Sequence, residues 1–152
     1  MKICITCSPG GHLAEVLKIL PILDNHAVFF YTIDVQSAKK TLRHNRSYFV
    51  SNPVKNPFKH IVNFFYSLRV IFVEKPRVII SSGAGVTIPI TFLSKILFGS
   101  KIIYLECSAQ VYKPSLTGRL VYTIADLFFV QWKYLLKFYK EKAVYGGRLL
   151  LY

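Results

Sequence analysis

The sequence has 152 residues, enough for one hydrophobic core, and is expected to form a single domain over residues 1–152. Hydrophobic residues make up 53% of it and charged residues 18%, and the net charge of +13 favours anionic partners such as a membrane surface, nucleic acid or phosphorylated substrates. The three cysteines cannot all pair in disulfides, which is consistent with a reducing cytoplasm. No apolar stretch reaches the roughly 18 uncharged residues of a membrane-spanning helix.

Apolar runs of strand length alternate with helical patterns along the whole chain. Asp34 and Ser115 each precede a predicted helix and are expected to cap it. The alternation is typical of an α/β fold, so we expect a single Rossmann-like domain with a mostly parallel sheet and helices on both faces. Strands are predicted over residues 2–7, 26–32, 48–50, 77–81, 101–106 and 127–131, and helices over residues 13–23, 36–43, 58–73, 86–98, 116–125 and 134–140.

The loop Ser8-Pro9-Gly10-Gly11-His12 joins the first predicted strand to the first predicted helix. Its glycines let the backbone pass close to a ligand, and the following helix points free N–H groups and the positive end of its dipole at the turn. Such a turn favours phosphate binding. His12 would lie at the mouth of the site, where a group that titrates near neutral pH can meet a substrate. The alternative is an ordinary strand-to-helix turn that carries a surface histidine.

Two further loops follow strands of the same predicted sheet. A second glycine turn, Ser82-Gly83-Ala84-Gly85, comes after the fourth predicted strand, and Glu106 ends the fifth. Ligands of open parallel sheets bind outside the carboxyl ends of the strands. The three loops are therefore expected to meet at one binding site.

The second glycine turn also imitates a dinucleotide-binding fingerprint, because Glu106 follows Gly83 and Gly85 after about twenty residues. Ile88, however, stands where the third glycine of that fingerprint is required. The sequence also lacks the Gly-x-Ser-x-Gly run of a nucleophile elbow and the Gly-Lys-Ser/Thr of a Walker phosphate loop. We therefore expect no nucleotide cofactor.

Cys4 and Cys7 have the spacing of half a metal site. Residues three apart on a strand face opposite sides, so the two thiols cannot readily reach one ion. Only Cys107 and four scattered histidines remain as further ligands. We expect these cysteines to be structural and predict no metal site.

The predicted helix over residues 58–73 is apolar over a wider arc than a surface helix needs. Basic residues stand close to it or within it: Lys55, Lys59, Arg69 and Lys75. Two interpretations stay open. The helix is either a core helix covered on both sides, or a helix partly sunk in the membrane interface with basic side chains that reach the lipid headgroups.

Several motifs occur together in the chain. Ser-x-Gly-Gly-His fills the first loop, Ser-Ser-Gly-Ala-Gly-Val-Thr-Ile-Pro-Ile begins at Ser81, and Leu105-Glu106-Cys107-Ser108-Ala109 precedes Leu116-Thr117-Gly118-Arg119-Leu120 and Ala125-Asp126. Val130-Gln131-Trp132 and Tyr145-Gly146-Gly147 follow near the end. Over nearly the whole chain, this combination resembles the asparagine-linked glycosylation protein fourteen family, whose bacterial relatives are polysaccharide-biosynthesis subunits of the CpsF and PssD type.

The resemblance implies the N-terminal half of a split GT-B glycosyltransferase similar to MurG-type enzymes, with the nucleotide-sugar-binding half on a separate polypeptide. It also implies a membrane-associated subunit that handles a polyprenyl-diphosphate-linked sugar acceptor. Eukaryotic members of the family carry an N-terminal membrane anchor, whereas Met1 leads directly into the first predicted strand here. We therefore expect peripheral attachment through the protein surface, at the cytoplasmic face of the membrane.

That assignment indicates which residues form the site. An acceptor diphosphate requires N–H donors and cations, which the two glycine turns and the basic surface supply, and an attacking sugar hydroxyl benefits from a general base. His12 and Glu106 are the catalytic candidates. The substrate-binding candidates lie in the two glycine turns: Ser8, Gly10, Gly11, Ser82, Gly83, Ala84, Gly85 and Thr87.

We therefore expect the acceptor-binding, membrane-recruiting subunit of a two-chain transferase that uses a UDP-linked sugar and is active only with a donor-binding subunit. The alternative is a protein of another class, a non-enzymatic basic module for anionic lipid or nucleic acid. Nucleic-acid binders interleave exposed aromatic residues with basic ones. The aromatic residues here lie mostly in apolar runs, so no nucleic-acid partner is expected.

Overall fold

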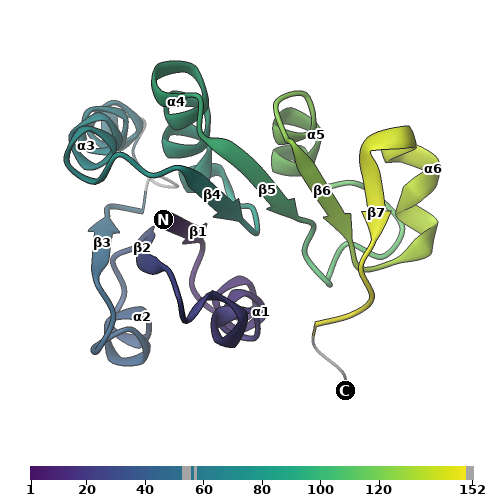
Figure 1. Ribbon diagram of the computed structural model, residues 1–152, viewed down its shortest axis with the longest axis horizontal. Coiled ribbons are helices and arrows are strands. Elements are labelled where there is room, and N and C mark those ends of the chain that lie inside the picture. The colour runs from purple at the N-terminus through teal and green to yellow at the C-terminus, as the bar shows by residue number, and fades with distance from the viewer. Residues whose placement is uncertain (53–55, 57, 150–152) are drawn as a thin grey trace.

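A computed structural model describes residues 1–52, 56 and 58–149. Lys55, one of the basic residues expected beside the apolar helix, lies outside the described residues. Seven strands in the described part of the chain form one sheet with the order β3-β2-β1-β4-β5-β6-β7 (Figure 1). Every neighbouring pair is parallel. The expected α/β class is confirmed, and the sheet is parallel throughout.

The element bounds agree closely with the predicted strands, and the structure adds a strand at the end of the described chain. The strands are β1 (Lys2–Cys7), β2 (Ala27–Ile33), β3 (Ser47–Val50), β4 (Val78–Ser81), β5 (Lys101–Leu105), β6 (Leu127–Val130) and β7 (Ala143–Tyr145). The α-helices are α1 (Gly11–Leu17), α2 (Gln36–Thr41), α3 (Phe58–Glu74), α4 (Ile88–Phe98), α5 (Leu116–Tyr122) and α6 (Leu136–Tyr139). Short 3₁₀ turns cover Leu20–Leu23, Gly85–Thr87, Lys133–Leu135 and Lys140–Lys142.

Helices cover both faces of the sheet. Figure 1 shows α3, α4 and α5 on one side and α1 and α2 on the other. Because side chains alternate along a strand, neighbouring residues enter different cores: Ile79 packs on the side of α3 and α4, and Ile80 packs on the side of α1. Cys4 and Cys7 likewise lie in different cores, as free, buried thiols. Their predicted separation is confirmed.

The first helix ends earlier than the sequence predicts. The pattern over residues 13–23 favours one continuous helix, but α1 ends at Leu17 and a 3₁₀ turn covers Leu20–Leu23. Pro21 explains the break, because it has no N–H to donate to the Leu17 carbonyl and its ring would crowd that carbonyl in a continuous helix.

The two predicted helix caps have different outcomes. The Ser115 Oγ accepts a hydrogen bond from the Gly118 N–H at 2.8 Å, which confirms the cap of α5. The cap predicted at Asp34 is wrong, because Val35 is the N-cap of α2 and no side chain caps it. The Asp34 carboxylate instead forms an ion pair with Lys39 at 2.7 Å, in the last turn of the same helix.

The helix α3 buries the polar Asn63 and Ser67 beside Val70 and Ile71, and it leaves many apolar residues exposed. Its buried Ser67 shares a hydrogen bond of 2.7 Å with the Tyr31 hydroxyl, and its buried Asn63 donates one of 2.8 Å to the Ser51 carbonyl. The described chain therefore covers α3 on one side only. We call its outward residues the apolar face of α3: Phe58, Ile61, Val62, Phe64, Phe65, Phe72 and Val73 are all exposed.

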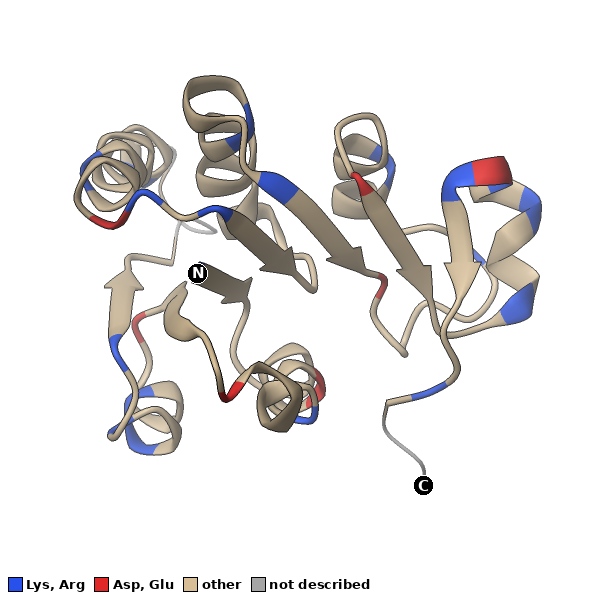
Figure 2. Cartoon of the chain, viewed as in Figure 1, with Lys and Arg blue, Asp and Glu red and all other residues tan. Residues whose placement is uncertain are grey.

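Basic residues are spread widely over the molecule. Figure 2 shows Lys and Arg on α2, α3, α4, α5 and α6 rather than on a single helix. On α3, the exposed Lys59 and Arg69 accompany the apolar face. Among the described residues, no helix combines the length and the apolar character that crossing a bilayer requires.

Candidate functional site

The three predicted loops meet at the carboxyl edge of the sheet. β4 lies between β1 and β5 and pairs with both. The chain adds β2 and β3 on one side of β1 and then returns to place β4 on the other side, so the strand order reverses between β1 and β4. Open α/β sheets bind their ligands at such a reversal, outside the carboxyl ends of the strands.

His12 lies against the second glycine turn. The Ser82 Oγ donates a hydrogen bond of 3.4 Å to the His12 carbonyl oxygen. A Cβ atom on Gly83 would come within 3.6 Å of His12 Cε1, which places the imidazole ring beside the Gly83 backbone. The ring is half-buried, and its Nδ1 is buried without a hydrogen-bond partner among the described residues. The two glycine turns, predicted separately, are therefore adjacent.

The second glycine turn requires glycine at position 83. Gly83 has a φ of +102°, and a Cβ there would lie 2.7 Å from the Tyr104 hydroxyl. Thr87 Oγ1 accepts a hydrogen bond from Ser81 Oγ at 3.2 Å and donates one to the Ala84 carbonyl at 2.8 Å, so its hydroxyl shapes the turn. Of the predicted binding residues, Gly10, Gly11 and Gly85 are exposed, Ser8 and Ala84 are half-buried, and Ser82, Gly83 and Thr87 are buried.

Glu106 was predicted to end the fifth strand; β5 ends at Leu105, and Glu106 follows it directly with a fully buried side chain. Oε1 accepts a hydrogen bond from the Cys107 N–H at 3.2 Å, and Oε2 accepts one from the Ser115 N–H at 3.2 Å and another from the Tyr139 hydroxyl. Burial and the neighbouring Glu106 carboxylate both raise the pKa of Tyr139, so this phenol stays protonated and donates. The Glu106 carboxylate thus ties the loop after β5 to α5 and α6.

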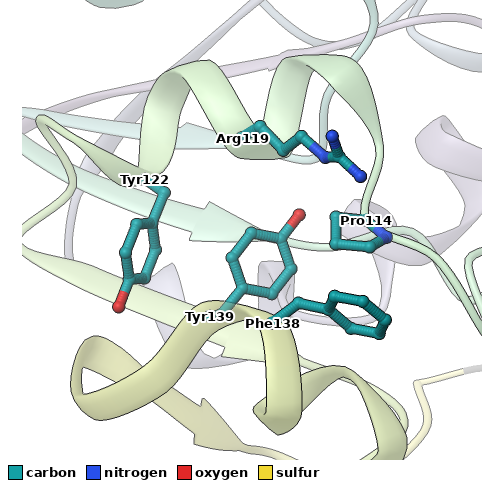
Figure 3. Close-up of a pocket in the computed structure, with 5 residues that line it drawn as sticks. All are labelled: Pro114, Arg119, Tyr122, Phe138 and Tyr139. Atoms are coloured by element: carbon teal, nitrogen blue, oxygen red, sulfur yellow. The ribbon is translucent and has the colours of Figure 1, made fainter.

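A surface pocket of ≈ 330 Å³ lies between α5 and α6. Tyr139 stands in the middle of it, with its hydroxyl pointing toward α5 (Figure 3). Because that hydroxyl is the donor to Glu106, the phenol separates the pocket from the buried carboxylate. The residues that line the pocket are Pro114, Arg119, Tyr122, Phe138 and Tyr139.

A second buried carboxylate, which the sequence analysis missed, lies near His12. Glu15 is fully buried; its Oε1 accepts hydrogen bonds from the Ser108 N–H at 2.9 Å and from the Ser108 hydroxyl. Its Oε2 has no partner among the described residues. A nitrogen of His12, a carboxylate oxygen of Glu15 and the Cys107 Sγ all lie within 4.8 Å of one another. His12 and Glu15 are three residues apart, a spacing that places both on one face of a helix. This spacing is the sequence signal from which the pair could have been predicted.

The site geometry belongs to a chain that matches a known family over almost its whole length. The family described as "Oligosaccharide biosynthesis protein Alg14 like" matches residues 3–149, a range that includes all three loops of the site. The chain belongs to this family. The resemblance inferred from the motifs is confirmed.

Curated relatives of this Alg14-like chain share the same printed name, "UDP-N-acetylglucosamine transferase subunit ALG14". The relative from Candida albicans is 31% identical over 173 residues, which cover 95% of this chain and 77% of the relative. The relative from Rattus norvegicus is 27% identical over 181 residues, with 99% and 83% covered. The relative from Saccharomyces cerevisiae is 28% identical over 183 residues, with 99% and 77% covered.

Solved structures confirm the fold of the Alg14-like chain. Acinetobacter baumannii MurG superimposes with a TM-score of 0.77 at 18% identity, over 97% of this chain and 45% of MurG. Staphylococcus aureus MnaA, solved with UDP, gives a TM-score of 0.74 at 15% identity, again over 97% of this chain and 45% of the other. The chain thus spans less than half the length of each of these structures.

Proposed function

We propose that this chain is the acceptor-binding and membrane-recruiting subunit of a two-chain glycosyltransferase. The enzyme transfers a sugar from a UDP-linked donor to a polyprenyl-diphosphate-linked glycan in polysaccharide or oligosaccharide biosynthesis. The observation that carries the proposal is the family match over residues 3–149, together with relatives named as UDP-N-acetylglucosamine transferase subunits. The likeness to 45% of MurG supports a division of the fold between two chains. UDP-N-acetylglucosamine is therefore the first donor to test.

In the proposed reaction, His12 is the general base. An acceptor hydroxyl attacks the anomeric carbon, the bond from that carbon to the UDP oxygen breaks, and the hydroxyl proton passes to His12. The half-buried position of His12 between the two glycine turns supports this role, and the exposed backbone at Gly10, Gly11 and Gly85 suits the acceptor diphosphate. We assign Glu106 a positioning role, because its buried carboxylate is occupied by Ser115 and Tyr139.

The donor-binding subunit is proposed to cover an apolar groove on the α1 side of the sheet. Helices normally cover both faces of a parallel sheet, but Figure 1 shows none of the described helices over β6 and β7 on this side. The groove has a volume of ≈ 300 Å³, which suits side chains of an apolar helix or strand from a partner. We call it the apolar groove; it is lined by Ile19, Ile22, Leu23, Ile80, Ile103, Leu105, Phe129, Gly146, Gly147 and Leu149.

Attachment to the cytoplasmic face of the membrane is proposed to occur through the apolar face of α3. Phe72 of this face packs edge-on against Phe98 of α4 at 5.4 Å between ring centroids, so the apolar surface continues onto a second helix, where Ile96 and Leu97 are also exposed. The basic Lys59 and Arg69 on α3 suit anionic headgroups, and each such cation near a membrane surface contributes about 1 kcal/mol.

Reconstitution of sugar transfer tests the proposed function. The purified chain is mixed with a donor-binding subunit that resembles the C-terminal half of MurG, labelled UDP-N-acetylglucosamine and a polyprenyl-diphosphate-linked acceptor. We expect no transfer by either chain alone and transfer by the mixture. Robust transfer by this chain alone would contradict the two-chain proposal. A basic binding module would instead retain anionic lipid or nucleic acid and give no transfer in any mixture.

A further inference from the structure

Two buried polar atoms at the site lack hydrogen-bond partners among the described residues: Nδ1 of His12 and Oε2 of Glu15. Their side chains project from the same helix, one turn apart, and one ring nitrogen of His12 lies within 4.8 Å of one carboxylate oxygen of Glu15. A carboxylate can only accept hydrogen bonds, and an imidazole N–H donates them, so the two groups are complementary. Because buried polar groups are almost always hydrogen-bonded, pairing these two would satisfy both at once.

We propose that Glu15 is a positioning residue for His12. Its Oε2 accepts a hydrogen bond from the Nδ1–H of His12, which fixes the tautomer that leaves Nε2 unprotonated and basic. The other nitrogen of a histidine ring is held in this way in many catalytic sites. This inference rests on the proposed function for its catalytic meaning, but the tautomer itself is a property of the chain alone.

The surroundings of Glu15 suit a fixed hydrogen-bond acceptor. Its Oε1 is held by the N–H and the hydroxyl of Ser108, in the loop after β5. That loop is itself anchored, because the Trp132 Nε1 donates a hydrogen bond of 2.6 Å to the Ser108 carbonyl. One carboxylate oxygen is thus occupied by the loop, and the other is left for His12.

A metal ion is the competing interpretation, because His12, Glu15 and Cys107 are all chemically able to ligate one. Burial raises the pKa of the Cys107 thiol, and this thiol lies 3.7 Å from Glu15 Oε1 as a donor. The thiolate, not the thiol, is the metal ligand. With Ser108 on Oε1 as well, the cluster suits a hydrogen-bonded pair better than a metal centre.

Glu15→Gln separates the roles of the two carboxylate oxygens. The backbone N–H of Ser108 can only donate, so it retains the new carbonyl oxygen at the Oε1 position. The amide nitrogen then occupies the Oε2 position and donates to Nδ1 of His12. A neutral His12 must therefore carry its proton on Nε2, the wrong nitrogen for a base that faces the acceptor.

Nitrogen NMR of the full chain labelled with ¹⁵N-histidine measures the tautomer directly. His12 is assigned by the signals lost in His12→Ala, and spectra are recorded at alkaline pH, where free imidazoles are neutral. We expect the Nδ1–H form in the wild type and the Nε2–H form in Glu15→Gln. Glu141→Gln, which neutralises an exposed carboxylate, is the matched control and should keep the wild-type tautomer. An Nε2–H wild type, or one tautomer in both proteins, would overturn the proposal.

The reconstituted enzyme supplies the second readout. Glu15→Gln should lower kcat by about tenfold or more and leave the acceptor KM nearly unchanged. The site would still bind the acceptor, but the proton on Nε2 would prevent His12 from acting as a base. If Glu15→Gln does not fold, the tautomer seen in the wild-type spectrum tests the proposal by itself. One equivalent of bound zinc in the purified chain, lost together with activity on chelation, would also overturn the proposal. If the mixture transfers no sugar, the proposed function is rejected, but the tautomer measured by NMR still stands.

Discussion

The Tyr139 hydroxyl donates a hydrogen bond to Oε2 of Glu106, across 33 residues of sequence. Both residues are buried, and the bond joins α6 to the carboxyl end of β5. Ser115, at the start of α5, donates its N–H to the same oxygen. The loop that follows β5 and carries Ser108 is therefore anchored from two helices, which fixes the position of Glu15 as well.

Gly118→Ala is predicted to loosen this network. A Cβ at position 118 would come closer to Glu106 Oε2, the Tyr139 hydroxyl and Ser115 Oγ than real Cβ atoms ever come to other heavy atoms. Overpacking of this kind costs about 1–3 kcal/mol, and each kcal/mol lowers Tm by about 2–4 °C in a domain of this size. Thermal melts measure the shift. Gly85→Ala is the control, because a Cβ there meets no atom within 4 Å; equal melts for the two variants would contradict the prediction.

His12→Ala and Glu106→Gln are predicted to fail in different ways. His12→Ala should leave the melt nearly unchanged and lower kcat by about a hundredfold or more, as expected for a general base. Glu106→Gln should mainly lower Tm, because an amide cannot accept from all the donors around this carboxylate as well as an anion does. The reconstituted enzyme and parallel melts provide both readouts.

The split between kcat and KM decides what His12 does. If the acceptor KM rises in His12→Ala with kcat nearly kept, His12 orients the acceptor and is not the base. Wild-type kinetics in both variants would place the catalytic group on the partner subunit.

Asp126 is predicted to make stability depend on acidic pH. Burial alone would raise its pKa, but hydrogen bonds from Lys95 at 2.7 Å, from the Ile102 N–H at 2.8 Å and from Lys101 at 3.2 Å lower it to about 2. A carboxylate with a lowered pKa stabilises the fold above its unfolded pKa of about 3.9 and loses that contribution as pH falls through about 2. Allowing for solvent screening of a partly exposed pair, the contribution is on the order of 1 kcal/mol.

Asp126→Asn measures this contribution. Its unfolding free energy should lie below that of the wild type at neutral pH, and the difference should disappear between about pH 4 and pH 2. Asp24→Asn changes an exposed carboxylate that forms no ion pair among the described residues and should follow the wild type throughout. A constant gap between Asp126→Asn and the wild type down to pH 2 would disprove the assignment.

The two apolar surfaces are predicted to be separable by mutation. Phe65 on the apolar face of α3 is 63% exposed, and Ile22 at the apolar groove is 79% exposed, so a charge at either site should not disturb the core. Phe65→Asp should lose sedimentation with anionic vesicles and keep binding to the donor-binding subunit. Ile22→Asp should do the reverse. The assignment of the two surfaces would be contradicted if each variant lost both vesicle binding and subunit binding, or if each variant kept both.

The fold could be predicted from the sequence because its strands are short apolar runs between turns. Their alternation with helices allows few arrangements other than a parallel sheet. The break before Pro21 was foreseeable from the sequence, but the favourable spacing of apolar residues on both sides of it masked it. The strand β7 could not be predicted from the sequence, because Ala143–Tyr145 has only three residues and is stabilised by pairing with β6.

The site was only partly predictable. Glycine turns and strand ends locate the rim of a parallel sheet, so the proximity of His12 and Gly83 could be expected. Whether a carboxylate at that rim faces solvent or the core depends on distant partners, and Tyr139 and Ser115 turn Glu106 inward. Glu15 was overlooked because a charged residue in a short helix is usually solvated. Its burial depends on donors from the distant loop after β5, chiefly Ser108.

The apolar face of α3 and the apolar groove use opposite sides of one sheet. Ile79 and Ile102 point to the side of α3 and α4, whereas their neighbours Ile80 and Ile103 point into the groove. A bilayer seated on α3 would therefore leave the groove clear of lipid, and a partner in the groove would leave α3 free. Attachment and assembly would then be compatible in either order. For a chain already on the membrane, a partner held at the same surface would find the groove by a search in two dimensions instead of three.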